Sequence, residues 1–137
     1  MQDYFHPSMT FQQVNAMSAL ALAHMGDCVF EILVRTFLCC HGGATNGNLH
    51  RETVSYVSAP AQSKFVAQLL PQLTPEETAL YKRGRNAHVH GVPKNATPGE
   101  YARATGLEAL FGALYLMGQE ARISELFTPI MEEIYAI

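Results

Sequence analysis

The stretch ALALAHMGDCVFEIL, Ala19–Leu33, decides the fold class of this 137-residue chain. Its apolar residues lie on nearly every side of the helix that the spacing predicts, as in a helix buried between others. Gly26 and Asp27 interrupt it, although glycine inside a helix costs about 1 kcal/mol relative to alanine. A buried, unpaired carboxylate costs more still. We therefore expect this pair to have a specific role, and binding of a metal ion is one candidate.

Helical signals continue along the chain, whereas the alternation typical of strands is weak. Asn15 or Ser18 is placed to cap the first long helix, and Ser58 to cap a later one. TPEE at Thr74–Glu77 and TPGE at Thr97–Glu100 both carry threonine at the N-cap, proline in the first turn and glutamate at the capping-box position. The sequence thus predicts an all-α protein. The expected helices run to about Leu38, over 49–56, over 59–70, from 75 into YKRGRNAH, from 98 to a stop at Gly118, and over 120–135 with Pro129 as a kink or boundary.

Length and composition indicate a single folded domain over residues 1–137. Three cysteines, two of them adjacent, do not suggest a disulfide framework. The N-terminus has no pattern of a signal peptide, and no apolar stretch is long enough to span a membrane. We expect a cytoplasmic protein that has no membrane partner.

The net charge of −3 conceals a basic segment. Between positions 82 and 103 there is one acidic residue, Glu100, and five of the nine basic residues of the chain. Such a cluster is either a solvated face that complements a helix dipole or a surface that binds phosphates. The five are Lys82, Arg83, Arg85, Lys94 and Arg103.

Glu108 repeats the feature seen at Asp27. It is an isolated charge in a helix that should be mostly buried, two residues after Gly106. Glycines let helix backbones approach closely, so we expect the two carboxylates to meet. Two carboxylates can hold a hard divalent cation such as Mg²⁺; each can instead be paired internally with a cation or a helix end.

Four segments together resemble Mini-ribonuclease III, the short branch of the ribonuclease III family that lacks a separate double-stranded-RNA-binding domain. They are ALAHMGDCVFEILVRTFL, YVSAPAQSKFV, RGRNAHVHGVPKNA and YARATGLEALFGALYL. The resemblance runs in order from about Leu20 to Leu126. It implies an all-helical, ribonuclease III-like endonuclease domain that forms a two-fold dimer.

The resemblance also implies an activity. The family cuts double-stranded RNA with Mg²⁺, for which Mn²⁺ can substitute, and leaves 5′-phosphate and 3′-hydroxyl ends. Asp27 and Glu108 match the pair that serves as catalytic and metal-binding residues. Longer ribonucleases III carry further acids near this pair, where the present chain has Leu20, Ala23 and Thr105; fewer charges favour one ion over two.

The basic segment acquires a role from the same resemblance. Its residues are expected to contact phosphates and 2′-hydroxyl groups across the minor groove of A-form RNA, so that recognition is by shape. The candidates are Arg83, Arg85, Asn86, Lys94 and Asn95. His88 and His90 do not have the spacing of a zinc site and are expected in a solvated loop. Gln62 and Ser63 are expected on a helix surface, where Gln62 either touches RNA or supports the core.

The sequence therefore predicts an endoribonuclease, a homodimer that cuts structured double-stranded RNA in the maturation of ribosomal RNA, the 23S precursor in particular. The alternative is a helical module that binds RNA or the ribosome without cutting. A third class is a helical interaction protein that has no nucleic-acid partner.

Overall fold

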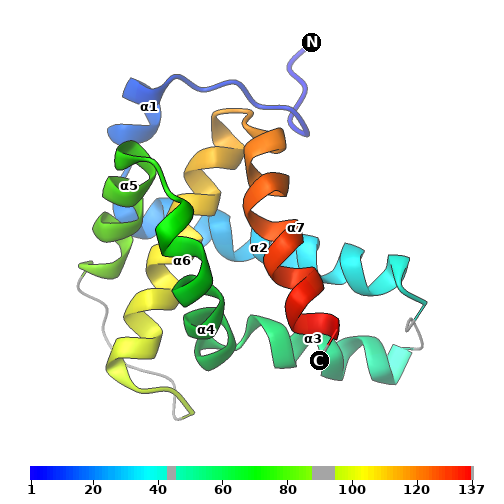
Figure 1. The fold of residues 1–137 in the computed structure, drawn as a ribbon. Helices are drawn as coiled ribbons and strands as arrows, with labels where there is room; N and C mark the ends of the chain where they lie inside the picture. The colour runs from blue at the N-terminus through cyan, green and yellow to red at the C-terminus, as the bar shows by residue number, and fades with distance from the viewer. Residues whose placement is uncertain (43–45, 88–94, 137) are drawn as a thin grey trace.

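The structure is a computed structural model that describes residues 1–42, 46–87 and 95–136 (Figure 1). Within these ranges every regular element is a helix, which confirms the all-α prediction. None of these helices combines the length and apolar character needed to cross a membrane. The elements are α1 (Phe11–Asn15), α2 (Ala19–Cys40), α3 (Asn46–Val57), α4 (Ala59–Leu69), the 3-10 turn η1 (Leu70–Gln72), α5 (Pro75–Arg85), α6 (Pro98–Leu116) and α7 (Glu120–Ala136).

Helices begin where short polar side chains can satisfy the free N–H groups of a first turn. Ser18 and Ser58 accept hydrogen bonds at the starts of α2 and α4. Thr74 and Thr97 form complete capping boxes at α5 and α6, as predicted. Asn15 is not the cap of α2; it ends α1, a five-residue helix that the sequence analysis missed.

Of the two breaks predicted near the C-terminus, at Gly118 and Pro129, only the one at Gly118 ends a helix. Gly118 follows α6 with a φ of 73°, a left-handed conformation that glycine adopts without steric cost. Pro129 does not bound a helix, because α7 continues through it to Ala136. Proline inside a helix removes one backbone hydrogen bond, and the packing of Leu126, Phe127 and Ile130 in the core offsets this loss.

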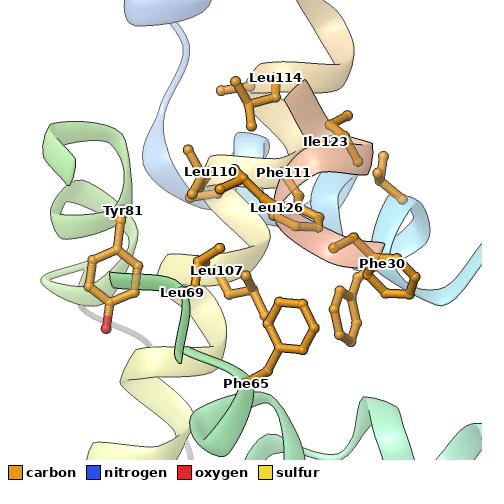
Figure 2. Close-up of a cluster of buried hydrophobic side chains, with 14 of the residues drawn as sticks. Phe30, Phe65, Leu69, Tyr81, Leu107, Leu110, Phe111, Leu114, Ile123 and Leu126 are labelled. Atoms are coloured by element: carbon orange, nitrogen blue, oxygen red, sulfur yellow. The ribbon is translucent and has the colours of Figure 1, made fainter. Parts of the chain in front are cut away.

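Phe30 of α2 belongs to the buried hydrophobic cluster (Figure 2). Its ring makes edge-to-face contacts with Phe65 of α4 at 5.3 Å, Phe127 of α7 at 5.9 Å and Phe111 of α6 at 6.0 Å between centroids. Edge-to-face aromatic pairs add about 0.5–1.5 kcal/mol each beyond the area they bury. One cluster of four aromatic rings thus joins helices from both halves of the chain.

Glycines let α2 and α6 cross at backbone contact. A Cβ atom on Gly26 would overlap the backbone carbonyl of Glu108, and one on Gly112 would overlap the carbonyl oxygen of Leu22. The crossing therefore has no room for any side chain at either position. Because Asp27 follows Gly26 directly, the crossing fixes where Asp27 and Glu108 lie relative to each other.

Gly106 has a different role from the one expected. A Cβ there would lie 2.7 Å from the ring of Tyr81 on α5. A Cβ added at Gly84 of α5 would clash with Ala109 of α6 in the same way. Gly106 thus allows close packing of α5 on α6, and Gly112 is the α6 glycine that faces α2. The expectation of close approach was right, but it was assigned to the wrong glycine.

A buried ion pair ties α7 to α5. Arg122 donates two hydrogen bonds of 2.8 Å to the carboxylate of Glu77 and a third to the Gln72 carbonyl. Glu77 is also the capping-box acid of α5. The hydrogen bonds from Arg122 are the main reason why the pKa of this buried carboxyl is lowered.

Replacing Gly26 with alanine tests the crossing. The added methyl group has to push α6 away, so we expect Gly26→Ala to lower the free energy of unfolding by about 3 kcal/mol or more. Gly47→Ala is the matched control, because nothing lies within 4 Å of a Cβ there; its effect should stay within about 1 kcal/mol. Urea denaturation followed by circular dichroism measures both. Equal effects of the two substitutions would contradict the role of the crossing.

Candidate metal site at the crossing of α2 and α6

Asp27 and Glu108 open into the same cleft, which lies beside the helix crossing and has a volume of about 170 Å³. The two carboxyl groups come within hydrogen-bonding reach of each other. Asp27 is exposed at the rim, while Glu108 is partly buried. The remaining lining residues are Leu20, Ala23, His24, Tyr101 and Thr105.

Glu108 is held in an unusual electrostatic environment. Burial, followed by the neighbouring negative charge of Asp27, raises the pKa of Glu108 to about 8. A hydrogen bond between the two carboxyl groups acts in the same direction, because it favours a proton shared by the pair. The fold therefore brings two acids together in a cleft whose described lining contains no lysine or arginine.

Gln62 is the one residue of α4 that hydrogen-bonds to this pair. Its Nε2 donates to Glu108 Oε2 at 3.4 Å and to the carbonyl oxygen of Val57 at 3.0 Å. The side chain is only 2% exposed, so the expected surface position was wrong. Ser63 is buried as well, and its Oγ accepts a hydrogen bond of 2.6 Å from Arg103 Nε.

The donor set suits a hydrated divalent cation. Within the described residues no group of three or more histidine, cysteine and acidic side chains is close enough to hold a metal by itself. Two carboxylates are nevertheless enough for Mg²⁺, which keeps several waters and takes further oxygens from a phosphate. Asp27 and Glu108, whose oxygens both open into the cleft, therefore fit such an ion.

Among the predicted RNA-binding residues, Arg83 makes internal hydrogen bonds. Both terminal nitrogens of Arg83 are engaged internally, at 3.2 Å with Asn15 Oδ1 and at 2.7 Å with the Met17 carbonyl. Arg83 thus fastens α5 to the connection between α1 and α2. Lys94 lies outside the described residues, as do His88 and His90.

Arg85 and Asn86 lie together at the end of α5. Arg85 Nε donates to Asn86 Oδ1 at 3.2 Å, and the guanidinium lies 5.8 Å from the centre of the Tyr81 ring. Asn86 is exposed and is the C-cap of α5. Asn95 is exposed in the turn before Thr97. Arg85 and Asn86 thus contact each other at the end of α5, whereas Arg83 makes contacts within the fold.

Sequence reasoning missed part of the cleft. His24 lies three residues before Asp27, and Tyr101 lies seven before Glu108, so helical spacing alone places them on the same sides as the acids. Thr105 donates from Oγ1 to the Tyr101 carbonyl at 2.9 Å. No comparable signal reveals Gln62, because its contact with Glu108 joins residues 46 positions apart.

Comparisons with known proteins identify the family of the chain. Residues 20–119 match the family model described as the ribonuclease III domain. The chain is 48% identical over 107 residues to Mini-ribonuclease 3 of Symbiobacterium thermophilum, with 78% of this chain and 82% of the relative covered. It is 38% identical over 128 residues to Mini-ribonuclease 3 of Clostridium tetani, with 92% and 85% covered.

A solved structure is similar as well. The crystal structure of a protein from Fusobacterium nucleatum superposes with a TM-score of 0.80 at 28% identity, over 88% of this chain and 97% of that one. Together, the family model over most of the chain and the relatives matched along most of their length decide the assignment. The chain belongs to the ribonuclease III family of endoribonucleases and, within it, to the Mini-ribonuclease 3 group.

Proposed function

We propose that this chain is a Mg²⁺-dependent endoribonuclease that cuts structured double-stranded RNA, with Asp27 and Glu108 as its catalytic, metal-binding pair. The observation that carries the proposal is the meeting of these two carboxyl groups in one cleft, where no lysine or arginine of the described residues lies among the lining side chains. Neither acid is consumed by an internal ion pair among the described residues. Two structural acids would each be expected to have an internal partner, whereas two metal ligands share one cleft.

The chain itself supplies position and charge. Asp27 at the rim and Glu108 below it present carboxylate oxygens from two helices whose crossing is fixed at Gly26 and Gly112. Asp27 and Glu108 would hold Mg²⁺, which when bound would supply an acidified water for in-line attack on a phosphodiester and charge stabilisation at the phosphate. The rigid crossing keeps the two carboxylates in register before substrate arrives, which limits reorganisation during the reaction.

One ion per cleft agrees best with the lining. Leu20, Ala23 and Thr105, the positions at which longer ribonucleases III carry acids, all line the cleft and bring no charge. A second cation would therefore depend on RNA phosphates for its ligands. The cleft favours a site with one resident ion, with Mn²⁺ able to replace Mg²⁺ because both prefer oxygen ligands.

The substrate and assembly follow from the family resemblance. We expect a precursor of ribosomal RNA, 23S in particular, as substrate, 5′-phosphate and 3′-hydroxyl ends as products, and the cytoplasm as the location. A two-fold dimer would place one cleft on each strand of a duplex. The end of α5, with Arg85 and Asn86, is the surface we assign to the RNA backbone, together with Asn95 and Lys94.

Cleavage assays on a labelled RNA duplex test the acid pair. We expect Asp27→Asn and Glu108→Gln each to lower kcat by about a thousandfold or more, because each removes a group that acts in the transition state. Duplex binding should be retained. Glu31→Gln is the matched control, since Glu31 lies one turn further along α2 and pairs with Arg35 at 3.0 Å. Wild-type protein that binds the duplex but does not cut it in Mg²⁺ would instead favour the binding module.

Stability against pH tests the like-charge pair in metal-free protein. A carboxyl whose pKa is higher in the folded state takes up a proton on folding, so stability falls as pH rises from about 5 to about 8. Glu108→Gln removes this loss. We expect the Tm of the variant in chelator to exceed that of wild type by an amount that grows over this range, and Mg²⁺ at pH 8 to shrink the difference. A difference that does not vary with pH would contradict the raised pKa.

Two neighbouring arginines separate RNA contact from structure. We expect Arg85→Ala to weaken duplex binding about three- to tenfold and to reduce the salt dependence by about one phosphate contact. Arg83→Ala should instead lower the free energy of unfolding by about 1–3 kcal/mol, since it removes two internal hydrogen bonds. Filter binding at several salt concentrations and denaturation measure the two effects. Exchanged phenotypes would overturn both assignments.

A further inference from the structure

We propose that Gln62 is a positioning residue for Glu108: its side-chain amide holds the carboxylate in the orientation in which it binds a divalent cation. The proposal rests on the proposed function, because it concerns the same pair of acids. It adds a third residue, from a third helix, to the group on which metal binding depends. Gln62 acts through Glu108 and is not itself assigned as a ligand.

The orientation of the amide is decided by its neighbours. Two acceptors, the Val57 carbonyl and Glu108 Oε2, lie at one end of the side chain. Only the NH₂ group can satisfy both, since an amide oxygen placed there would face two other oxygens. The Val57 carbonyl therefore anchors the donor, and the second N–H remains for Glu108.

Stability alone does not explain a glutamine at this position. The side chain is 2% exposed, and its Oε1 has no donor within the described part of the chain. A buried amide oxygen without a protein partner costs about 1–3 kcal/mol. A residue that carries such a cost beside a catalytic acid is better explained by the acid that it contacts than by the core around it.

A neutral donor also suits the chemistry of the site. An arginine or lysine at position 62 would give a hydrogen bond to Glu108 as well, but its positive charge would compete with a metal ion for the carboxylate. An amide restrains the carboxylate while leaving its negative charge for the ion. Groups that orient metal ligands in this way are worth about ten- to a hundredfold in affinity or activity.

Mn²⁺ binding to purified protein, measured by calorimetry without RNA, is the first test. Gln62→Met keeps the length of the side chain and removes its hydrogen bonds. We expect its Kd for Mn²⁺ to rise about tenfold, kcat for duplex cleavage at fixed Mg²⁺ to fall, and KM to stay near that of wild type. Ser63→Ala is the matched control, because it removes the other α4–α6 hydrogen bond, to Arg103, and makes no contact with Glu108. Its Kd for Mn²⁺ should be unchanged.

The outcomes separate this inference from the proposed function. If Gln62→Met binds Mn²⁺ as tightly as wild type does, Gln62 only fills space and the inference is wrong. If wild-type binding is insensitive to Asp27→Asn, the metal site itself is wrong and both proposals are overturned together.

A measurement on the wild-type protein covers the case in which Gln62→Met fails to fold. The side-chain ¹⁵NH₂ signals of Gln62 can be assigned by through-bond NMR in a chain of 137 residues. We expect them to shift when Mg²⁺ is added to wild type and not when it is added to Asp27→Asn. Signals that do not move with Mg²⁺ in a protein that binds it would overturn the inference.

Discussion

The backbone contact between α2 and α6 is the constraint on which the rest of the molecule depends. Gly26 lies against the carbonyl of the very residue whose side chain forms half of the site, and Gly112 lies against α2 one turn away. The contact therefore fixes the backbone positions from which the two carboxylates extend. The contact between Phe30 and Phe111 packs the same two helices together, so core packing and site geometry depend on one helix pair.

The parts of the fold that are local in sequence were predictable. Ser18, Ser58, Thr74 and Thr97 mark helix starts because a cap involves residues at most three positions apart. The missed helix α1 carries such a signal too, since Thr10 and Gln13 form a capping box, but five residues give no hydrophobic period to read. Local capping signals thus located four helix starts, and the fifth was missed because its helix is too short to show a hydrophobic pattern.

Prediction failed where distant segments meet. The choice between Gly106 and Gly112 depends on which side of α6 faces α2, and the nearly all-round burial of α6 leaves no polar face from which to infer this. Gln62 looked exposed because amides usually are, and only the position of Glu108 across the helix interface explains its burial. Asp27 and Glu108 themselves were identified because isolated charges in apolar helices stand out from their neighbours and because the family motifs cover both.

The glycine crossing makes the integrity of the carboxylate pair depend on the integrity of the fold. A site divided between two helices in backbone contact has no half-assembled form, since any opening of the seam dismantles the carboxylate pair and the core at once. Fraying at the termini leaves α2 and α6 in contact, whereas opening of the seam also disrupts the aromatic core, because Phe30 and Phe111 lie on the same two helices.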